Sequence, residues 1–298
     1  MNMSMPSEYA AMLAEHEEWA TDHTKGKRAS FAGMNLAGLD LSGRDLFEAD
    51  FSRADLSDTY LSDANFSEAN LAGANLTRAR VIGADFSRAN LTRARLTGTY
   101  GVRADFSGAR LIGAIMSDAD LSHADLSNTD LSGAILIRTN MDKGTFTGAN
   151  LTGALLIRAN MSGAKMSDVV FSDADLSNAD LSDADLYGAD LIRARLFEAN
   201  LSRVTLASAN LSGAQLSGAN LLGVNLINTI GNGKEIKSIE LGWWNVVWTH
   251  EVLQIGCECH PIARWWEFTQ EEIAAMHPGA VAWWARYKAP LRGIIEAE

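Results

Sequence analysis

A five-residue period constrains this chain more than any other feature. A large apolar residue recurs at every fifth position from Phe31 to Leu226, which makes about forty units, and Gly101 is the one non-apolar member. A small residue, most often Ala, stands two positions earlier. A period of five fits neither an α-helix, at about 3.6 residues per turn, nor a strand, at about 2. The chain must therefore bend in every unit, and stacked bends bury a continuous core, as in a solenoid.

The phenylalanines indicate how many units make one coil. Counted modulo 20 they fall in two classes, whereas counted modulo 15 they scatter over all three; they are Phe31, Phe51, Phe66, Phe86, Phe106, Phe146 and Phe171. Because aromatic side chains stack on one another, a four-sided coil of 20 residues is favoured. Residues 29–230 then form about ten coils, and a spacing of about 4.8 Å gives a tower about 48 Å tall.

The slot before the large residue is commonly Asp or Asn, and Ser or Thr commonly follows it. Asp and Asn side chains bond the backbone of turns, so a structural role explains most of these carboxylates. The chain has no nucleophile-elbow, phosphate-loop, dinucleotide or zinc-protease motif. We therefore predict a protein that is not an enzyme, with no catalytic residue and no cofactor.

The repeated string, as in Ala54-Asp55-Leu56-Ser57-Asp58, resembles the pentapeptide-repeat family of bacterial proteins. The resemblance covers about two thirds of the chain, which makes it specific. It implies a mainly β fold, a right-handed, four-sided parallel β-helix. It also implies a possible activity, because some members are similar to duplex DNA in size and charge and bind type II topoisomerases such as DNA gyrase.

Gly101 departs from the repeat. A missing leucine leaves a hole that costs about 2–5 kcal/mol if it stays empty. We expect Tyr100 or Val102 to shift inward, with a local bulge at this coil and no loop insertion elsewhere.

Non-repeat sequence flanks the tower and predicts a cap at each end, because a bare solenoid end exposes apolar core and unpaired backbone. Residues 1–28 form an N-terminal helical cap, with the helix over residues 6–24. Residues 231–298 form a tryptophan-rich cap or interaction segment of mixed α/β structure. Within it we expect one or two strands between Ile236 and Ile255 and helices that open near Pro261, Thr269 and Pro278. Of each adjacent tryptophan pair, one ring should pack and the other face a second surface.

The only two cysteines, Cys257 and Cys259, lie too close in sequence to staple a fold, which is typical of a reducing compartment. With His260 and His250 they suggest a metal site, but the spacing is uncommon for structural zinc and no fourth ligand is obvious. We expect a buried or half-buried structural role and no metal. Without a signal pattern or a run of 18 apolar residues, the sequence predicts a cytoplasmic protein that does not bind membranes.

Charge argues against nucleic acid as a partner. The chain has 37 acidic and 25 basic residues, a net charge of -12, so phosphates would be repelled. The tower carries its charge in bands, and a basic belt over residues 78–110 separates two acidic bands, residues 40–68 and 168–190. Duplex DNA of the same height carries about 28 charges, far more than the net charge of this tower, so the belt weakens DNA mimicry.

One outward patch departs from the polar pattern. Ile115, Ile135 and Leu155 occupy the slot that is usually Asp or Asn, and Ile137 and Ile157 the slot that is usually Ser or Thr. With 20-residue coils these side chains share one wall, beside Arg138 and Arg158. Contiguous exposed apolar surface with a polar rim marks interfaces.

We therefore predict a protein-interaction scaffold whose partner binds at this patch. A homodimer through the same patch or through the C-terminal segment is an alternative, and the family resemblance adds a modulator of DNA gyrase that mimics DNA.

Overall fold

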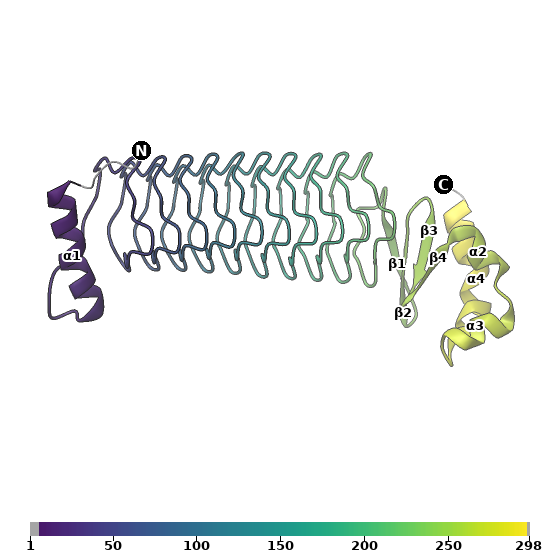
Figure 1. The fold of residues 1–298 in the computed structure, drawn as a ribbon. Helices are drawn as coiled ribbons and strands as arrows, with labels where there is room; N and C mark the ends of the chain where they lie inside the picture. Colours follow the sequence, from purple (N-terminus) through teal and green to yellow (C-terminus); the bar gives the residue numbers. More distant parts are fainter. Residues whose placement is uncertain (1–5, 297–298) are drawn as a thin grey trace.

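The computed structural model describes residues 6–296. These residues form a long tower with a helix across one end and a small α/β unit at the other (Figure 1). None of the described helices is long and apolar enough to cross a membrane.

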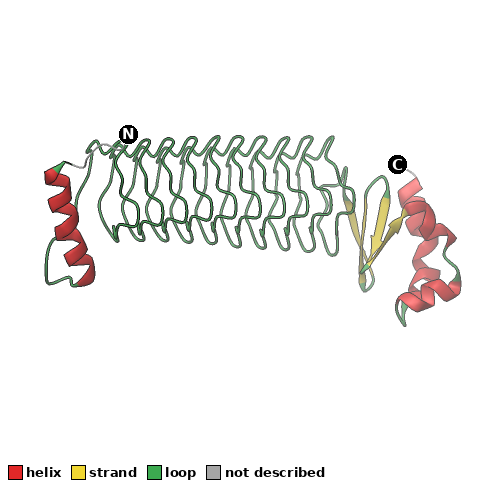
Figure 2. Cartoon of the chain, viewed as in Figure 1, coloured by secondary structure: helices red, strands yellow, loops and turns green. Residues whose placement is uncertain are grey.

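Successive coils pair through parallel bridges between residues 20 positions apart, as in Ser30 with Asp50 and Asp50 with Asn70. Four pentads therefore make one coil, as the phenylalanine spacing predicts. Each pentad contributes a single bridging residue, so the walls are built from isolated bridges rather than longer strands, and the tower is drawn as turns and loops (Figure 2).

A tight turn closes every pentad, and the pentad of Phe51 shows how. The Ala54 N–H donates to the Phe51 carbonyl at 3.0 Å, and Arg53 has a φ of 56°. A positive φ at the third residue of such a turn is typical of type II. The Asp50 carboxylate accepts the Ser52 N–H at 3.0 Å. The side chain to backbone bond predicted for the Asp and Asn slot is therefore present.

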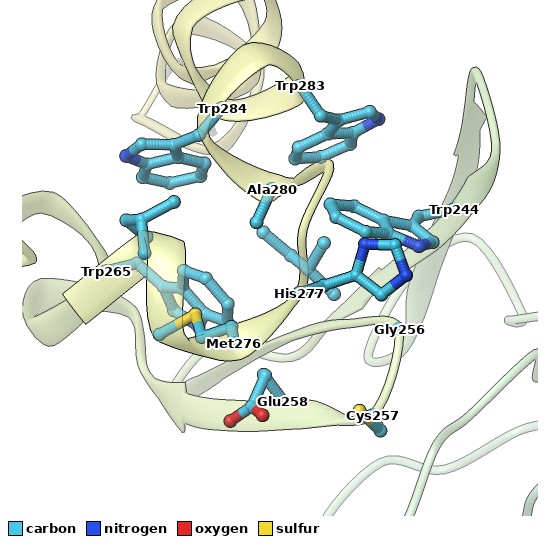
Figure 3. A pocket seen from close by; sticks show the side chains of 12 residues that line it. Trp244, Gly256, Cys257, Glu258, Trp265, Met276, His277, Ala280, Trp283 and Trp284 are labelled. Carbon is cyan, nitrogen blue, oxygen red and sulfur yellow. The ribbon is translucent and has the colours of Figure 1, made fainter. Parts of the chain in front are cut away.

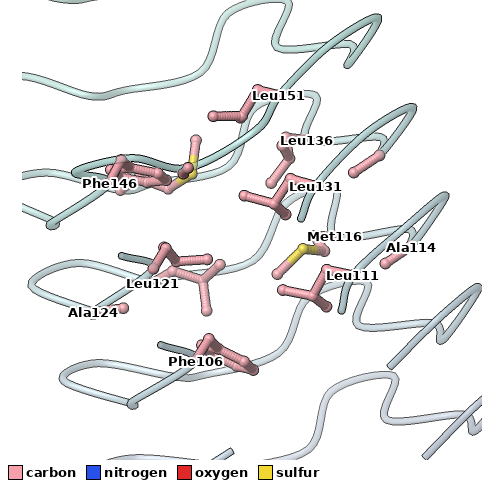
Figure 4. Close-up of a cluster of buried hydrophobic side chains, with 14 of the residues drawn as sticks. Phe106, Leu111, Ala114, Met116, Leu121, Ala124, Leu131, Leu136, Phe146 and Leu151 are labelled. Atoms are coloured by element: carbon pink, nitrogen blue, oxygen red, sulfur yellow. The ribbon is translucent and has the colours of Figure 1, made fainter. Parts of the chain in front are cut away.

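The core is one column of inward side chains. Phe31 stacks on Phe51 at 4.9 Å between ring centroids, and Phe86 stacks on Phe66 and on Phe106 at 5.0 Å. Figure 4 shows the part from Phe106 to Leu151, where leucine, methionine and alanine side chains of successive coils lie above one another. Since every large slot in this part is buried, each coil buries the apolar faces of its two neighbours.

The expected bulge at Gly101 is absent, and that prediction was wrong. The turn pattern continues unchanged through the coil, and Tyr100 is 52% exposed rather than turned inward. Side chains of the coils above and below occupy the space instead. A Cβ on Gly101 would lie 2.8 Å from Leu121 Cδ2 and 3.0 Å from Val81 Cγ2.

Restoring the consensus leucine at this slot is therefore expected to destabilise the tower. Gly101→Leu should lower the free energy of unfolding by about 1–3 kcal/mol, because the added carbons overpack Leu121 and Val81. Urea unfolding measures the change, and Val102→Leu, which enlarges a half-exposed neighbour, is the control. A stabilised Gly101→Leu protein would show that the slot is an empty cavity.

Helix α1 (Ser7–Thr21) covers the first coil, within the predicted range 6–24. Leu13 and His16 are buried, and the Tyr9 ring meets Phe31 edge-on at 6.4 Å. His16 Nδ1 accepts the Ala29 N–H at 3.0 Å, and burial lowers the pKa of this imidazole. The helix thus covers the apolar end of the tower, and the neutral His16 accepts the backbone N–H of Ala29, where the tower begins.

The other end is closed by an antiparallel sheet in the order β1–β2–β3–β4. Its strands are β1 (Lys237–Leu241), β2 (Trp244–Trp248), β3 (Val252–Ile255) and β4 (Glu258–Pro261). Ile236 and Val247 join the core of the tower, and the Leu226 N–H donates to Gln254 Oε1 at 2.8 Å. The prediction of one or two strands was wrong. A turn at Gly256, with φ 60°, adds β4 beyond the range that the hydrophobic alternation marked.

Three helices pack on the far side of this sheet: α2 (Ile262–Glu267), α3 (Gln270–Met276) and α4 (Ala280–Glu296). The helix predicted to open near Thr269 does so, and Thr269 and Glu272 form a capping box at its start. The expectation for adjacent tryptophans fails for one pair, because both Trp283 and Trp284 are buried. Their neighbours in this second core come from the sheet as well as from the helices, so both rings find apolar surroundings.

Candidate partner-binding face

The isoleucine face is the wall of the tower whose outward ladder contains Ile115, Ile135 and Leu155. These three residues bridge one another in consecutive coils. Ile115 and Ile135 are half-buried by their neighbours, and Leu155 is 38% exposed. The structure therefore brings together the three residues that the sequence placed on one wall.

A second apolar column runs beside the first. Ile137 and Ile157 belong to consecutive coils on the same wall and are both half-buried. The backbone holds them in register, because the Arg138 N–H donates to the Ile157 carbonyl at 3.0 Å and the Asp118 N–H to the Ile137 carbonyl at 3.1 Å. Since the pairing of coils fixes these backbone positions, the five aliphatic side chains form a preorganised surface that needs no rearrangement to bind.

The two arginines at the rim differ in their bonding. Arg138 donates through Nε and Nη2 to the two carboxylate oxygens of Asp118, each at 2.7 Å. These hydrogen bonds lower the pKa of the Asp118 carboxyl and raise the pKa of Arg138. Arg158, one coil further, is exposed and has no ion pair among the described residues. Arg158 is therefore the rim cation available to a partner.

The ladder ends in charge at both sides. Arg95 bridges Ile115 from the coil before, and Asp175 bridges Leu155 from the coil after. Asp175 already lies 3.6 Å from Arg195, whereas Arg95 is exposed and has no ion pair among residues 6–296. The apolar centre therefore has two uncompensated cations on its border, Arg95 and Arg158.

A second wall of the tower, next to the isoleucine face, is also partly apolar. The tyrosine face is the wall that carries Tyr60, Arg80 and Tyr100 in one ladder, with Ile82 beside them. The exposed fractions are 37% for Tyr60, 37% for Ile82 and 52% for Tyr100. The Arg80 guanidinium lies 5.9 Å from the Tyr100 ring centroid. The slot of Ile82, normally Ser or Thr, was the signal that this wall is also partly apolar.

The basic belt has arginines on all four walls, but on the wall of Asp85 its one arginine, Arg88, is paired with Glu68 at 3.3 Å. The belt arginines that have no ion pair among the described residues lie on the other three walls. Arg80 and Arg103 are on the tyrosine face, and Arg95 is on the isoleucine face. Arg93 and Arg110 are on the wall between the isoleucine face and the fourth wall, whose ladder contains Asp85, Asp105 and Asp125. That fourth wall is the acidic face. Asp85, Asp105 and Asp125 bridge in consecutive coils through the height of the belt. The acidic ladder of this wall therefore continues through the height of the belt.

The cysteine and histidine group gathers no set of metal ligands. Both cysteines are free and exposed, so the expectation of a buried or half-buried role was wrong for them. The side chain of His260 lies 3.3 Å from Glu258 Oε2, and partial desolvation by neighbouring atoms raises the pKa of the Cys259 thiol although the residue as a whole is exposed. Within the described part of the chain, no three His, Cys, Asp or Glu side chains lie close enough together to hold an ion.

The family of the chain follows from comparison with known proteins. The model of pentapeptide repeats matches eight times, over residues 27–63, 59–98, 82–118, 104–142, 114–153, 135–173, 154–192 and 194–230. A comparison with functionally curated proteins finds no match.

The solved structure of HetL agrees with this match. HetL, a pentapeptide repeat protein involved in heterocyst differentiation regulation from the cyanobacterium Nostoc sp. strain PCC 7120, is 33% identical, with a TM-score of 0.68 over 74% of this chain and 95% of HetL. QnrB1, a plasmid-mediated fluoroquinolone resistance protein, is 22% identical, with a TM-score of 0.39 over 68% of this chain and 92% of QnrB1. This chain belongs to the pentapeptide-repeat family.

Proposed function

We propose that this protein is a non-enzymatic scaffold, a right-handed, four-sided column that binds a protein partner on its isoleucine face. The observation that carries the proposal is the ladder of Ile115, Ile135 and Leu155, which replaces polar residues in three consecutive coils. Aliphatic side chains in an outward slot do not stabilise the core, and exposed contiguous apolar area favours association. The similar protein HetL is involved in regulation, a role that binding without catalysis would serve.

The chemistry of the face defines the partner. Its flat apolar centre suits an amphipathic segment, and an apolar core with a polar rim is the usual anatomy of an interface. The free cations Arg95 and Arg158 border this centre, so acidic side chains on the partner gain complementary charge. We infer a partner surface of aliphatic residues flanked by carboxylates.

The test places charge in the centre of the face. Ile135→Asp with Leu155→Asp should weaken partner binding by at least about tenfold, because buried interface anchors contribute most of the affinity and the new carboxylates would be desolvated. The matched control is Ser132→Asp with Thr152→Asp, which adds the same charge to the adjacent wall in the same region of the tower.

Capture from the native host, read by mass spectrometry, compares these two double variants with the parent protein. A partner retained by the control and lost by the isoleucine-face variant supports the proposal. Light scattering of the purified protein tests the homodimer, because self-association through this face should vanish in the same variant. Identical partners and identical mass for all three proteins would reject the face.

The acidic face favours a second candidate, a DNA mimic that modulates a type II topoisomerase. Its ladder of Asp85, Asp105 and Asp125 spaces one carboxylate per coil. Each also accepts a backbone N–H of its own turn, at 2.7–2.9 Å, which holds the carboxylates in a fixed row. Gyrase supercoiling with added protein tests this candidate, and no inhibition, protection or binding at micromolar protein would discard it.

A further inference from the structure

The C-terminal unit contains an aromatic pocket that the proposed scaffold function does not use. It lies between the sheet and helices α3 and α4, and it encloses about 70 Å³. Four indole rings line it, from Trp244, Trp265, Trp283 and Trp284 (Figure 3). A cavity of about 150 Å³ binds benzene in another protein. This smaller pocket is open on one side, so a group of that size would lie partly between the rings and partly in the open mouth.

The rings are packed into one continuous set. Trp244 lies 5.1 Å from Trp283, and Trp265 lies 5.4 Å from Trp284, both measured between ring centroids and both tilted. Trp283 and Trp284 are 6.4 Å apart and nearly parallel. Since the indole nitrogens of Trp265 and Trp283 donate to the carbonyls of Leu253 and Leu241, each at 2.6 Å, these two rings are fixed in place and their nitrogens are not available to a ligand.

The charge of the pocket is negative. Glu258, on strand β4, is the one acidic residue of the lining, and none of the described lining residues is Lys or Arg. Figure 3 shows Glu258 across the pocket from Trp283 and Trp284. His277 also lines the pocket, and its Nδ1 accepts the Gly279 N–H at 3.0 Å. Among the described residues, His260 is the one titratable group within hydrogen-bond reach of the Glu258 carboxylate, at 3.3 Å from Oε2.

The same tryptophan cluster already holds cations of this chain. Lys288 Nζ lies 5.4 Å from the Trp284 ring centroid, and the Arg292 guanidinium lies 5.6 Å from that of Trp266. An indole is the strongest of the aromatic side chains in attracting a cation to its face. The rings that surround the pocket therefore belong to a cluster that stabilises positive charge.

We propose that this pocket binds a small organic cation of the quaternary ammonium class. Its methyl groups would contact the indoles, and the Glu258 carboxylate would balance its charge. An anion would be repelled by Glu258. A primary ammonium needs hydrogen-bond acceptors for three N–H groups, whereas this lining offers one carboxylate and is otherwise largely apolar. A quaternary ammonium has no N–H to satisfy, so it matches the lining.

Tryptophan fluorescence titrations test the proposal on the full-length protein. Tetramethylammonium and choline are compared with 3,3-dimethylbutan-1-ol, the neutral isostere of choline, at constant ionic strength. Choline should bind at least about tenfold more tightly than the isostere, because the cation–π attraction is lost with the charge. Equal affinity for choline and the isostere would overturn the proposal in favour of a simple apolar site, and no saturable binding of either cation would also overturn it.

Two variants locate the site. Glu258→Gln keeps the shape of the side chain and should weaken choline binding by about tenfold, with no change for the neutral isostere. Glu251→Gln removes an exposed carboxylate of the same unit that contacts His250, and it should bind choline as the parent does. An equal loss in both variants would show that the cation responds to overall charge rather than to the pocket. Circular dichroism confirms that each variant is folded.

Discussion

Replacing Phe86 by alanine should lower the free energy of unfolding by about 3–5 kcal/mol. Phe86 is fully buried, and its ring stacks on both Phe66 and Phe106 at 5.0 Å. Removing it takes away apolar burial and two ring contacts at once. It also leaves a cavity, because the coils above and below are held at a fixed spacing by their backbone bridges and cannot collapse into it. Chemical denaturation followed by circular dichroism measures the change.

Phe86→Leu is the matched control, since leucine fills the same slot at Leu126 on this wall. It should cost less than half as much as Phe86→Ala, because most of the volume is kept. If the two variants were equally destabilised, the volume that leucine keeps would not matter, and the cavity would not explain the loss of stability.

The core of the tower was predictable because its information is local and repeated. Two classes of phenylalanine position were enough to choose coils of 20 residues, and the ring stacks of Phe31 on Phe51 and of Phe66 on Phe86 are the physical reason. Gly101 was misjudged for the opposite reason. Whether its slot is empty depends on Val81 and Leu121, 20 residues away on each side, whose side chains lean into the space.

The isoleucine face was predictable in position, since the slots of Ile115 and Ile135 face outward in every coil. The ion pairing of its rim arginines was not predicted. The sequence offered Arg138 and Arg158 as equivalent rim cations, whereas the structure pairs Arg138 with Asp118. An ion pair between coils depends on which two turn residues are 20 positions apart in the sequence, as Asp118 and Arg138 are. The pattern within one pentad does not contain this information.

The C-terminal pocket could not be predicted from the sequence. Its four indoles come from strand β2 and from helices α2 and α4, so their meeting depends on contacts between segments that no period relates. The tryptophan pairs were visible, but helical geometry alone predicted one exposed ring per pair. The burial of both Trp283 and Trp284 follows from the sheet that packs against α4, and at least two of its four strands were missing from the prediction.

Replacing Ile236 by aspartate should release the C-terminal unit from the tower. Ile236 is fully buried and belongs to the core of the tower rather than to that of the C-terminal unit. An unpaired charge at this position would cost several kcal/mol, about 3–5 by analogy with a broken buried ion pair. This cost weakens the contact between the C-terminal unit and the last coil rather than the whole tower, because each unit of a solenoid is stabilised by its nearest neighbours.

Two measurements separate this detachment from global unfolding. Hydrogen exchange should accelerate in residues 206–230 and in β1 and β2, while the central coils keep their protection. Sedimentation should show self-association that grows with concentration, because the freed end exposes apolar core and unpaired backbone. Ile227→Asp, at a half-buried position on the outer wall of the last coil, is the control and should leave both measurements unchanged. Uniform acceleration along the whole tower would instead mean that the cap and all coils unfold as one cooperative unit.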